Sequence, residues 1–241
     1  MPAVPDTRGV RNGAIVLRNT AGIRLLRGQF VAARRRAQGA DVPKIGMEEI
    51  RRRQLIDATI ASIHEVGFGE SSLSRISAKA GVSTGIVHHY FEDKADLLEA
   101  TLRQLGNNLH QSVVTRLAAA QSPIDRLMAV VDGNLGPELF TPESVSAWLA
   151  FWAQVPNNER FARVQRIIIG RLHDNLVAAL RPLAPASEIL EIARLVASLI
   201  DGLWLRAALQ PEAPDCIAAR GMVIDYLNAK LKLNIAVERK P

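Results

Sequence analysis

The sequence predicts an all-α fold of about nine helices. From Met47 onward, apolar residues recur every three or four positions, which is the period of one helix face. No stretch alternates apolar and polar residues for long enough to build a sheet. Several expected helix starts are marked by Pro or a capping residue: Ser122-Pro123, Thr141-Pro142, Pro156-Asn157, Ala186-Ser187 and Pro214.

Length and composition are those of a globular protein with a sizeable core. A chain of 241 residues, 48% of them hydrophobic, accommodates a small module and a larger helical domain. The most apolar segment, 195–209, contains Asp201 and Arg206 and is shorter than the roughly 20 uncharged residues of a membrane span. The single cysteine, Cys216, excludes an internal disulfide and a multi-cysteine zinc site. We therefore expect a cytoplasmic protein with no cofactor, no metal and no membrane partner.

The net charge of +6 and the pI near 10.0 come from one end of the chain. Residues 1–42 contain eight Arg and only two acids, Asp6 and Asp41. The other 199 residues are balanced, with 22 basic and 22 acidic side chains. The total charge is therefore not evidence for nucleic-acid binding.

The helices before and after residues 72–91 are expected to support a DNA-binding motif. A helix from Met47 has Ile56, Ile60 and Ile63 on one face and Gly67 as its stop. A long amphipathic helix follows Lys94 and runs to about Leu117, which would tie the motif to the rest of the protein.

Residues 72–91 have the pattern of a helix-turn-helix. Leu73, Ile76 and Ala80 have helical spacing, Ser72 is available as the N-cap, and Gly81 is expected to end the helix in the left-handed conformation.

The second helix of this motif is expected to enter a DNA groove. Ser83 is its expected cap, and Thr84, Gly85, His88 and His89 lack the apolar bulk that would hold the backbone away from the bases. A solvated turn is the alternative for the two histidines. Ile86 and Val87 are expected to face inward.

Residues around this helix are expected to contact the DNA backbone. Tyr90 and Lys94 are candidate phosphate anchors, and Ser72 and Arg75 would hold the flanking phosphate. The residues Arg51–Arg53 form a basic cluster that either contacts DNA or is a solvated face. The predicted DNA-contacting set is Ser72, Arg75, Ser83, Thr84, Gly85, His88, His89, Tyr90 and Lys94.

The three Trp residues, Trp148, Trp152 and Trp204, all lie in the C-terminal part of the chain. Aromatic faces and an acid are what a quaternary ammonium needs, because it has no N–H to donate. Trp148 and Trp152 are four residues apart and share a helix face, although aromatic residues at this spacing also fill cores. Asp201, within an apolar run, needs either a basic partner such as Arg206 or a bound cation. These three Trp residues and Asp201 are the candidate ligand site.

The helix-turn-helix residues resemble the TetR family of bacterial repressors. The matching positions are Gly81, Val82, Ser83, Gly85, Tyr90, Phe91, Lys94 and Leu97. His88 departs from the pattern, since many members have Tyr there, which puts that residue's phosphate contact in doubt. The resemblance implies a TetR-like fold: a DNA-binding domain over 43–94 and a ligand-binding and dimerisation domain over 95–235.

Three further stretches, 43–59, 147–153 and 199–209, resemble one subgroup of this family, the choline-responsive repressors of the glycine betaine pathway. This resemblance covers roughly residues 43–231. It implies a homodimer on near-palindromic operator DNA, with helices at about 187–209 and 215–231 forming the dimer. It further implies a repressor of choline uptake and choline-to-glycine-betaine genes that choline or betaine aldehyde releases.

Two alternatives remain for the function. One is a TetR-type repressor that responds to another cationic or lipophilic small molecule, as efflux regulators do. The other is a helical enzyme or binding protein that uses the Trp and Asp pocket alone. The second is disfavoured because the sequence has no phosphate-binding Gly loop, zinc-protease helix, nucleophile elbow or Cys/His metal set.

Residues 1–42 are expected to be disordered or absent from the native product. Their Arg-rich composition suits a basic arm on DNA phosphates or an amphipathic leader. The other interpretation is that translation begins at Val42, since GTG is an initiation codon that encodes Val when read internally, and the resembling repressors begin close to this point.

Overall fold

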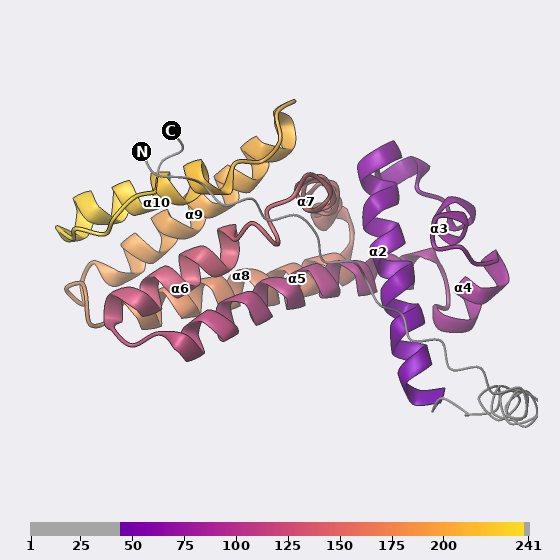
Figure 1. Ribbon diagram of the computed structural model, residues 1–241, viewed down its shortest axis with the longest axis horizontal. Helices are drawn as coiled ribbons and strands as arrows, with labels where there is room; N and C mark the ends of the chain where they lie inside the picture. The colour runs from indigo at the N-terminus through magenta and orange to yellow at the C-terminus, as the bar shows by residue number, and fades with distance from the viewer. Residues whose placement is uncertain (1–43, 239–241) are drawn as a thin grey trace, which may run out of the picture. The chain divides into compact units, whose positions relative to one another are not determined.

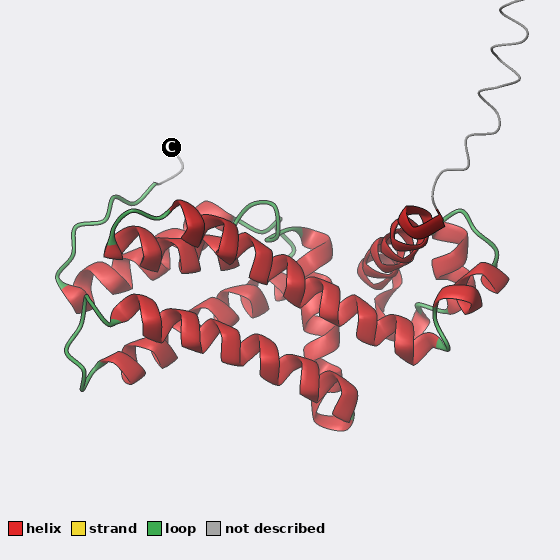
Figure 2. Cartoon of the chain, turned by 90° about the horizontal axis from the view of Figure 1, so that it is seen from below, coloured by secondary structure: helices red, strands yellow, loops and turns green. Residues whose placement is uncertain are grey.

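The computed structural model describes residues 44–238, and these residues form nine α-helices and one 3-10 helix (Figure 1). The helices are α2 (Lys44–Glu70), α3 (Leu73–Lys79), α4 (Thr84–Tyr90), α5 (Lys94–Ala119), α6 (Pro123–Leu135), α7 (Pro142–Gln154), η1 (Val155–Asn157), α8 (Glu159–Leu180), α9 (Ile189–Leu209) and α10 (Cys216–Leu231). The described part contains no strand, which confirms the all-α prediction (Figure 2). The expectations for residues 1–42 lie outside the described residues. Among the described helices, none has the length and hydropathy required to cross a membrane.

Most helix starts follow the predicted capping chemistry. Ser122 caps α6 through a capping box with Asp125, and Thr141 caps α7 by accepting a hydrogen bond from the Ser144 amide. α8 begins later than expected, because Pro156 belongs to η1 and Asn158 provides the cap. Local side-chain to backbone hydrogen bonds therefore place these helix starts to within a few residues.

The expected stop at Gly67 is a break within α2. Gly67 has φ 80° and ψ 169°, and helical hydrogen bonding resumes beyond it as far as Glu70. The Ser71 hydroxyl donates to the Gly67 carbonyl oxygen at 2.8 Å, and the Ser62 hydroxyl donates to Ser71 at 3.0 Å. Glycine is suited to this position because it adopts positive φ without steric cost.

Two hydrophobic cores organise the described residues. The smaller one joins α2, α3, α4 and the start of α5, and its fully buried members include Leu55, Ile76 and Leu97. The larger one is built from α5 to α10 and also takes Ile63 from α2. The predicted domain boundary after Lys94 coincides with the start of α5, a helix that contributes to both cores. The boundary itself stays a prediction.

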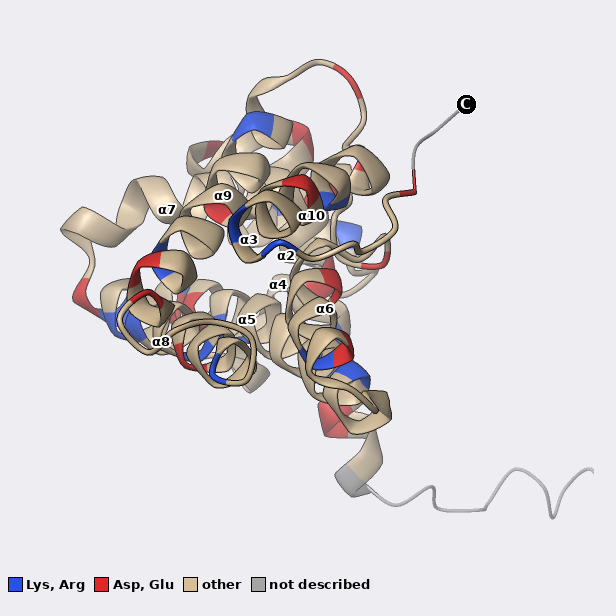
Figure 3. Ribbon diagram, turned by 90° about the vertical axis from the view of Figure 1, so that its left-hand side faces the viewer, with Lys and Arg blue, Asp and Glu red and all other residues tan. Residues whose placement is uncertain are grey.

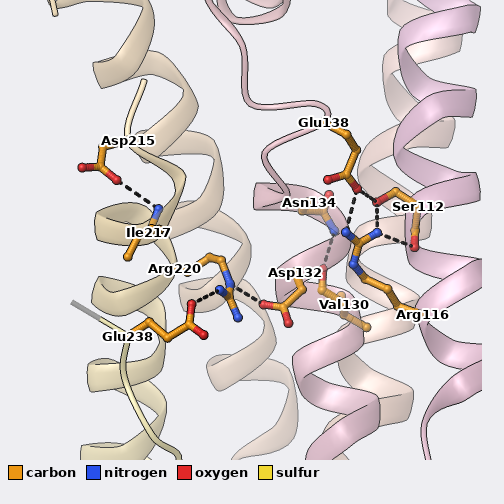
Figure 4. A network of polar contacts seen from close by, with 10 residues as sticks. All are labelled: Ser112, Arg116, Val130, Asp132, Asn134, Glu138, Asp215, Ile217, Arg220 and Glu238. Carbon is orange, nitrogen blue, oxygen red and sulfur yellow. Dashed lines mark hydrogen bonds and ion pairs between the residues drawn. The ribbon is translucent and has the colours of Figure 1, made fainter. Parts of the chain in front are cut away.

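Polar contacts connect α10 to α6 and to the residues that follow α10 (Figure 4). The Arg220 guanidinium lies 2.7 Å from the Asp132 carboxylate and 3.4 Å from that of Glu238. The Asn228 side chain donates to the Ile235 carbonyl oxygen and accepts from the Ile235 amide. The contacts of Asn228 and Arg220 hold residues 235–238 against α10.

Charged side chains of both signs are interspersed along the helices (Figure 3). This distribution agrees with the equal numbers of basic and acidic residues after position 42. Two of the ion pairs between described residues join positions four apart on one helix, Arg53 with Asp57 on α2 and Arg103 with Glu99 on α5. Such pairs contribute at most about 1 kcal/mol to stability each.

The contact of α5 with α6 is expected to depend on Gly133. A Cβ at this position would lie 2.5 Å from Val113 Cγ2 and 2.7 Å from Val113 Cα, and backbone cannot move aside as a side chain can. We expect Gly133→Ala to lower the free energy of unfolding by about 1 to 3 kcal/mol, as measured by urea denaturation. The control is Gly170→Ala in α8, where a Cβ meets nothing within 4 Å. There, Ala should raise stability by about 0.5 to 1 kcal/mol. Equal effects of the two substitutions would contradict the tight packing.

Candidate DNA-binding helices and effector cavity

The turn between α3 and α4 is formed as the sequence predicts. The Ser72 hydroxyl accepts a hydrogen bond from the Arg75 amide at 3.3 Å, so Ser72 caps α3. Gly81 has φ 68° in the turn, and the Val82 amide donates to the Ser77 carbonyl oxygen at 3.0 Å. Val82 packs partly buried against the smaller core. The angle between the two helices is therefore set by local hydrogen bonds and one apolar contact.

The predicted cap of α4 is only partly realised. Ser83 occupies the N-cap position with extended backbone, but its side chain makes no capping hydrogen bond. Instead, the hydroxyls of Thr84 and the buried Ser77 lie 3.2 Å apart and connect α4 to α3. The exposed Ser83 hydroxyl is thus left available for another partner.

The exposed face of α4 carries the residues expected there, with one difference. Thr84, Gly85, His88 and His89 are exposed, and Val87 is buried in the smaller core. The expectation that Ile86 faces inward is wrong, since its side chain is 40% exposed. A helix of seven residues presents one short inward face, and neighbouring positions differ by about 100° around its axis. Val87 is the fully buried residue of that face, and Tyr90, one turn later, packs partly buried against the same core.

The candidate phosphate contacts surround this face. Ser72 and Arg75 are exposed on α3, and Lys94 is the first residue of α5. Neither Arg75 nor Lys94 forms an ion pair with another described residue. The Tyr90 ring packs edge-on against His89, with ring centroids 4.9 Å apart. Within residues 44–238, Arg75 on α3 and Lys94 at the start of α5 are therefore cations without an acidic partner.

The Arg51–Arg53 cluster makes internal contacts that neither interpretation of the sequence foresaw. The Arg52 guanidinium donates to the Tyr90 carbonyl oxygen and lies over the Phe91 ring, 4.3 Å from its centroid. Arg52 thereby fixes the C-terminal end of α4 to α2 through a hydrogen bond and a cation–π contact. Arg51 bonds to Gln54, and Arg53 lies 3.9 Å from Asp57.

The larger core contains a cavity that brings together the four predicted ligand residues. Trp148 and Trp152 come from α7, and Asp201 and Trp204 come from α9. The Trp148 ring centroid lies 5.8 Å from that of Trp152 and 6.2 Å from that of Trp204. The cavity has about 380 Å³ of empty space, including its open side.

These aromatic residues belong to the core and to the cavity at once. Trp148 and Trp204 are only 3% and 4% exposed, and both pack in the larger core. The Trp204 indole N–H donates to the Asn134 carbonyl oxygen at 3.0 Å, which fixes its ring. The same Trp residues therefore fill the core and line the cavity, so core packing does not exclude a ligand site.

Asp201 is the only ionisable residue among the described residues that line the cavity. It is exposed on one side, yet its surroundings exclude enough water to raise the pKa of its carboxyl group to about 6. No described basic residue, Arg206 included, forms an ion pair with it. Of the two kinds of partner that the sequence suggests for Asp201, the described residues supply no basic side chain, and the bound cation stays a prediction.

Two polar lining residues were missed by the sequence analysis. Gln165 on α8 and Asn134 on α6 both face this cavity. No sequence signal identifies them, because they are far apart along the chain and isolated among unrelated neighbours. The Trp152 indole nitrogen Nε1 and Gln165 Oε1 are both buried without a hydrogen-bond partner among the described residues.

Known proteins match both parts of the chain. Residues 55–101 match the model for bacterial regulatory proteins of the TetR family, and residues 123–232 match the model for BetI-type transcriptional repressors, C-terminal. An HTH-type transcriptional regulator BetI from Serratia proteamaculans is 42% identical over 79% of this chain and 98% of the relative. The Escherichia coli K12 regulator of the same name is also 42% identical, with the same coverage.

Solved structures share the fold. A putative transcriptional regulator from Pseudomonas aeruginosa is 27% identical, with a TM-score of 0.66 over 76% of this chain and 91% of that one. A putative transcriptional regulator from Saccharomonospora viridis, solved in complex with choline, has a TM-score of 0.67 at 21% identity, over 78% of this chain and 98% of that one. Together with the BetI relatives, these matches show that the chain belongs to the TetR family of transcriptional regulators, with a C-terminal domain of the BetI type.

Proposed function

We propose that this BetI-type repressor controls genes for choline uptake and choline oxidation to glycine betaine, and that choline or betaine aldehyde releases it from DNA. The observation that carries the effector is the cavity with three Trp rings and one carboxylate. Each aromatic face within about 6 Å of a cation contributes roughly 0.5 to 2 kcal/mol, and Asp201 supplies the opposite charge. The choline complex of the Saccharomonospora viridis regulator supports this assignment.

In this proposal, α4 is the recognition helix. Thr84, Gly85, His88 and His89 face the bases, and the exposed Ile86 is placed to contact a thymine methyl group. Backbone contacts come from Ser72, Arg75, Ser83, Tyr90 and Lys94, which set register without reading sequence. Arg52 acts indirectly, by holding the end of α4.

The proposed DNA-binding unit is a homodimer in the cytoplasm. Large apolar side chains are exposed on the last two helices, including Leu195 and Leu209 on α9 and Met222 on α10. Their burial against a second copy would place two recognition helices about 34 to 36 Å apart, in successive major grooves of a near-palindromic operator.

Helix α5 offers a direct route from the cavity to the DNA-binding helices. Leu109 lines the cavity, and Leu97 is buried in the smaller core on the same helix. An effector that binds better to one arrangement of α5 lowers DNA affinity by the ratio of its affinities for the two arrangements.

A different cationic or lipophilic effector is the second candidate, because most of the cavity lining is apolar. In that case the protein would still bind its operator, but choline would not weaken the complex. A panel of unrelated quaternary amines in the assays below separates the two candidates.

The first prediction concerns DNA binding, measured by fluorescence anisotropy at fixed salt with the intergenic DNA beside the gene. We expect sequence-specific binding that choline weakens. Lys94→Ala should weaken binding to all sequences and lower the slope of log affinity against log salt by about one, since one phosphate contact is lost. His88→Ala should instead reduce the preference for the operator. Equal losses of preference in both variants would contradict the assigned roles.

The second prediction concerns Asp201→Asn. The variant removes the charge opposite the ligand, so choline affinity at pH 7.5 should fall at least about tenfold, measured by calorimetry. In the wild type, affinity should fall as pH drops below about 6, because the carboxylate becomes protonated.

The same variant should be more stable than the wild type at pH 7.5. The pKa of Asp201 rises from 3.8 to about 6 on folding, so the folded state favours the protonated carboxyl, and that contribution is lost as pH rises through 6. Solvent screens this exposed charge, so the gain is expected to be about 1 kcal/mol or less. It should shrink at pH 5, and the exposed control Asp174→Asn should show neither effect. A destabilised Asp201→Asn protein would contradict this account.

A further inference from the structure

Two buried polar atoms in the effector cavity have no partner in the described protein. Trp152 Nε1 and Gln165 Oε1 belong to residues that line the same cavity, and each atom is shielded from solvent. More than about 90% of buried polar groups in folded proteins are hydrogen-bonded. The indole N–H only donates, and the amide oxygen only accepts. Two residues of the cavity wall therefore carry one unused donor and one unused acceptor.

Packing holds both side chains in the cavity wall. Trp152 is held by its ring contact with Trp148, with centroids 5.8 Å apart. On α8, the cavity is lined by Gln165, Ile168, Ile169 and Leu172, so Gln165 is the one polar residue of that face. One helical turn before Gln165, the fully buried Phe161 anchors the helix in the larger core.

We propose that Trp152 and Gln165 form a hydroxyl-reading subsite, which makes the cavity selective for a quaternary ammonium alcohol. This inference rests on the proposed choline site. A hydroxyl is the small group that accepts from the Trp152 N–H and donates to Gln165 Oε1 at the same time. An ethyl group does neither, and an aldehyde or carboxylate oxygen only accepts. A carboxylate additionally meets the charge of Asp201 in the same cavity.

Specificity follows from the cost of leaving these atoms unpaired. A site built to hydrogen-bond a hydroxyl discriminates strongly against the analogue that lacks it, whereas an apolar pocket distinguishes such pairs weakly. The Trp rings and Asp201 recognise the ammonium group of either ligand. Trp152 Nε1 and Gln165 Oε1 recognise the other end of choline.

The test compares choline with ethyltrimethylammonium, which has the same cationic head and lacks the hydroxyl. All three Trp residues of the chain line the cavity, so ligand binding is measured by tryptophan fluorescence and checked by calorimetry on the full chain. We expect wild-type protein to bind choline at least about tenfold more tightly than ethyltrimethylammonium. Glycine betaine should bind more weakly than choline.

Three variants test whether Gln165 is the residue that distinguishes choline from ethyltrimethylammonium. Gln165→Met keeps the length of the side chain and removes the acceptor, so the affinity ratio should approach one through loss of choline affinity alone. Gln165→Glu keeps an acceptor and should retain the preference for choline. Gln111→Met makes the same change at an exposed position of α5 outside the cavity lining and should leave the ratio unchanged.

Each outcome decides between the inference and the proposed function. Equal affinities of the wild type for choline and ethyltrimethylammonium would overturn the hydroxyl subsite and leave the choline-responsive repressor intact. An unchanged ratio in Gln165→Met would also overturn the subsite. Failure of the wild type to bind either cation would overturn both proposals. The wild-type comparison needs no variant, so it holds even if a substitution impairs folding.

Discussion

The structure depends on one continuous helix that belongs to two cores. Adjacent residues of α5 are divided between them, Leu97 in the core of the DNA-binding helices and Leu98 in the larger core. Twelve residues after Leu97, Leu109 lines the effector cavity. An α-helix is stiff because each amide bonds to a carbonyl four residues earlier, and α5 spans 26 residues without interruption. In the proposed function, this continuity would carry a displacement of the cavity segment to the residues that support α4.

The basic residues near the helix-turn-helix fall into two groups. Arg52 is used within the protein, where it ties the end of α4 to α2, while Arg75 and Lys94 have no acidic partner among the described residues. A basic residue next to a helix-turn-helix is thus not by itself a DNA contact. The distinction arises because guanidinium binds a carbonyl and an aromatic face at once, a combination that stabilises a short helix with few buried side chains.

The main chemical feature of the candidate cavity is a carboxylate that is partly removed from water and has no basic partner among the described residues. Asp201 lies among aromatic and aliphatic side chains that raise its pKa to about 6, and no described residue offsets its charge. In the proposed function, the cost of holding this carboxylate ionised near neutral pH would fall when a cation binds, and part of the ligand's affinity would be the release of that cost. Trp152 Nε1 and Gln165 Oε1 are also buried without a hydrogen-bond partner among the described residues. Because these atoms are uncharged, the cost of burying them is smaller than for a carboxylate.

Features that depend on short-range patterns could be predicted from the amino-acid sequence. The helix-turn-helix could be located because a cap at Ser72, a left-handed Gly81 and apolar spacing are short-range patterns, and Trp148 and Trp152 share a face because they lie four residues apart. Only the tertiary structure decided the outward position of Ile86, the internal use of Arg52, and the meeting of Gln165 and Asn134 with the Trp residues. These depend on which helices pack together, and packing between elements distant in sequence leaves no local pattern to recognise. The pKa of Asp201 belongs to the same class, since desolvation is set by neighbours from several helices.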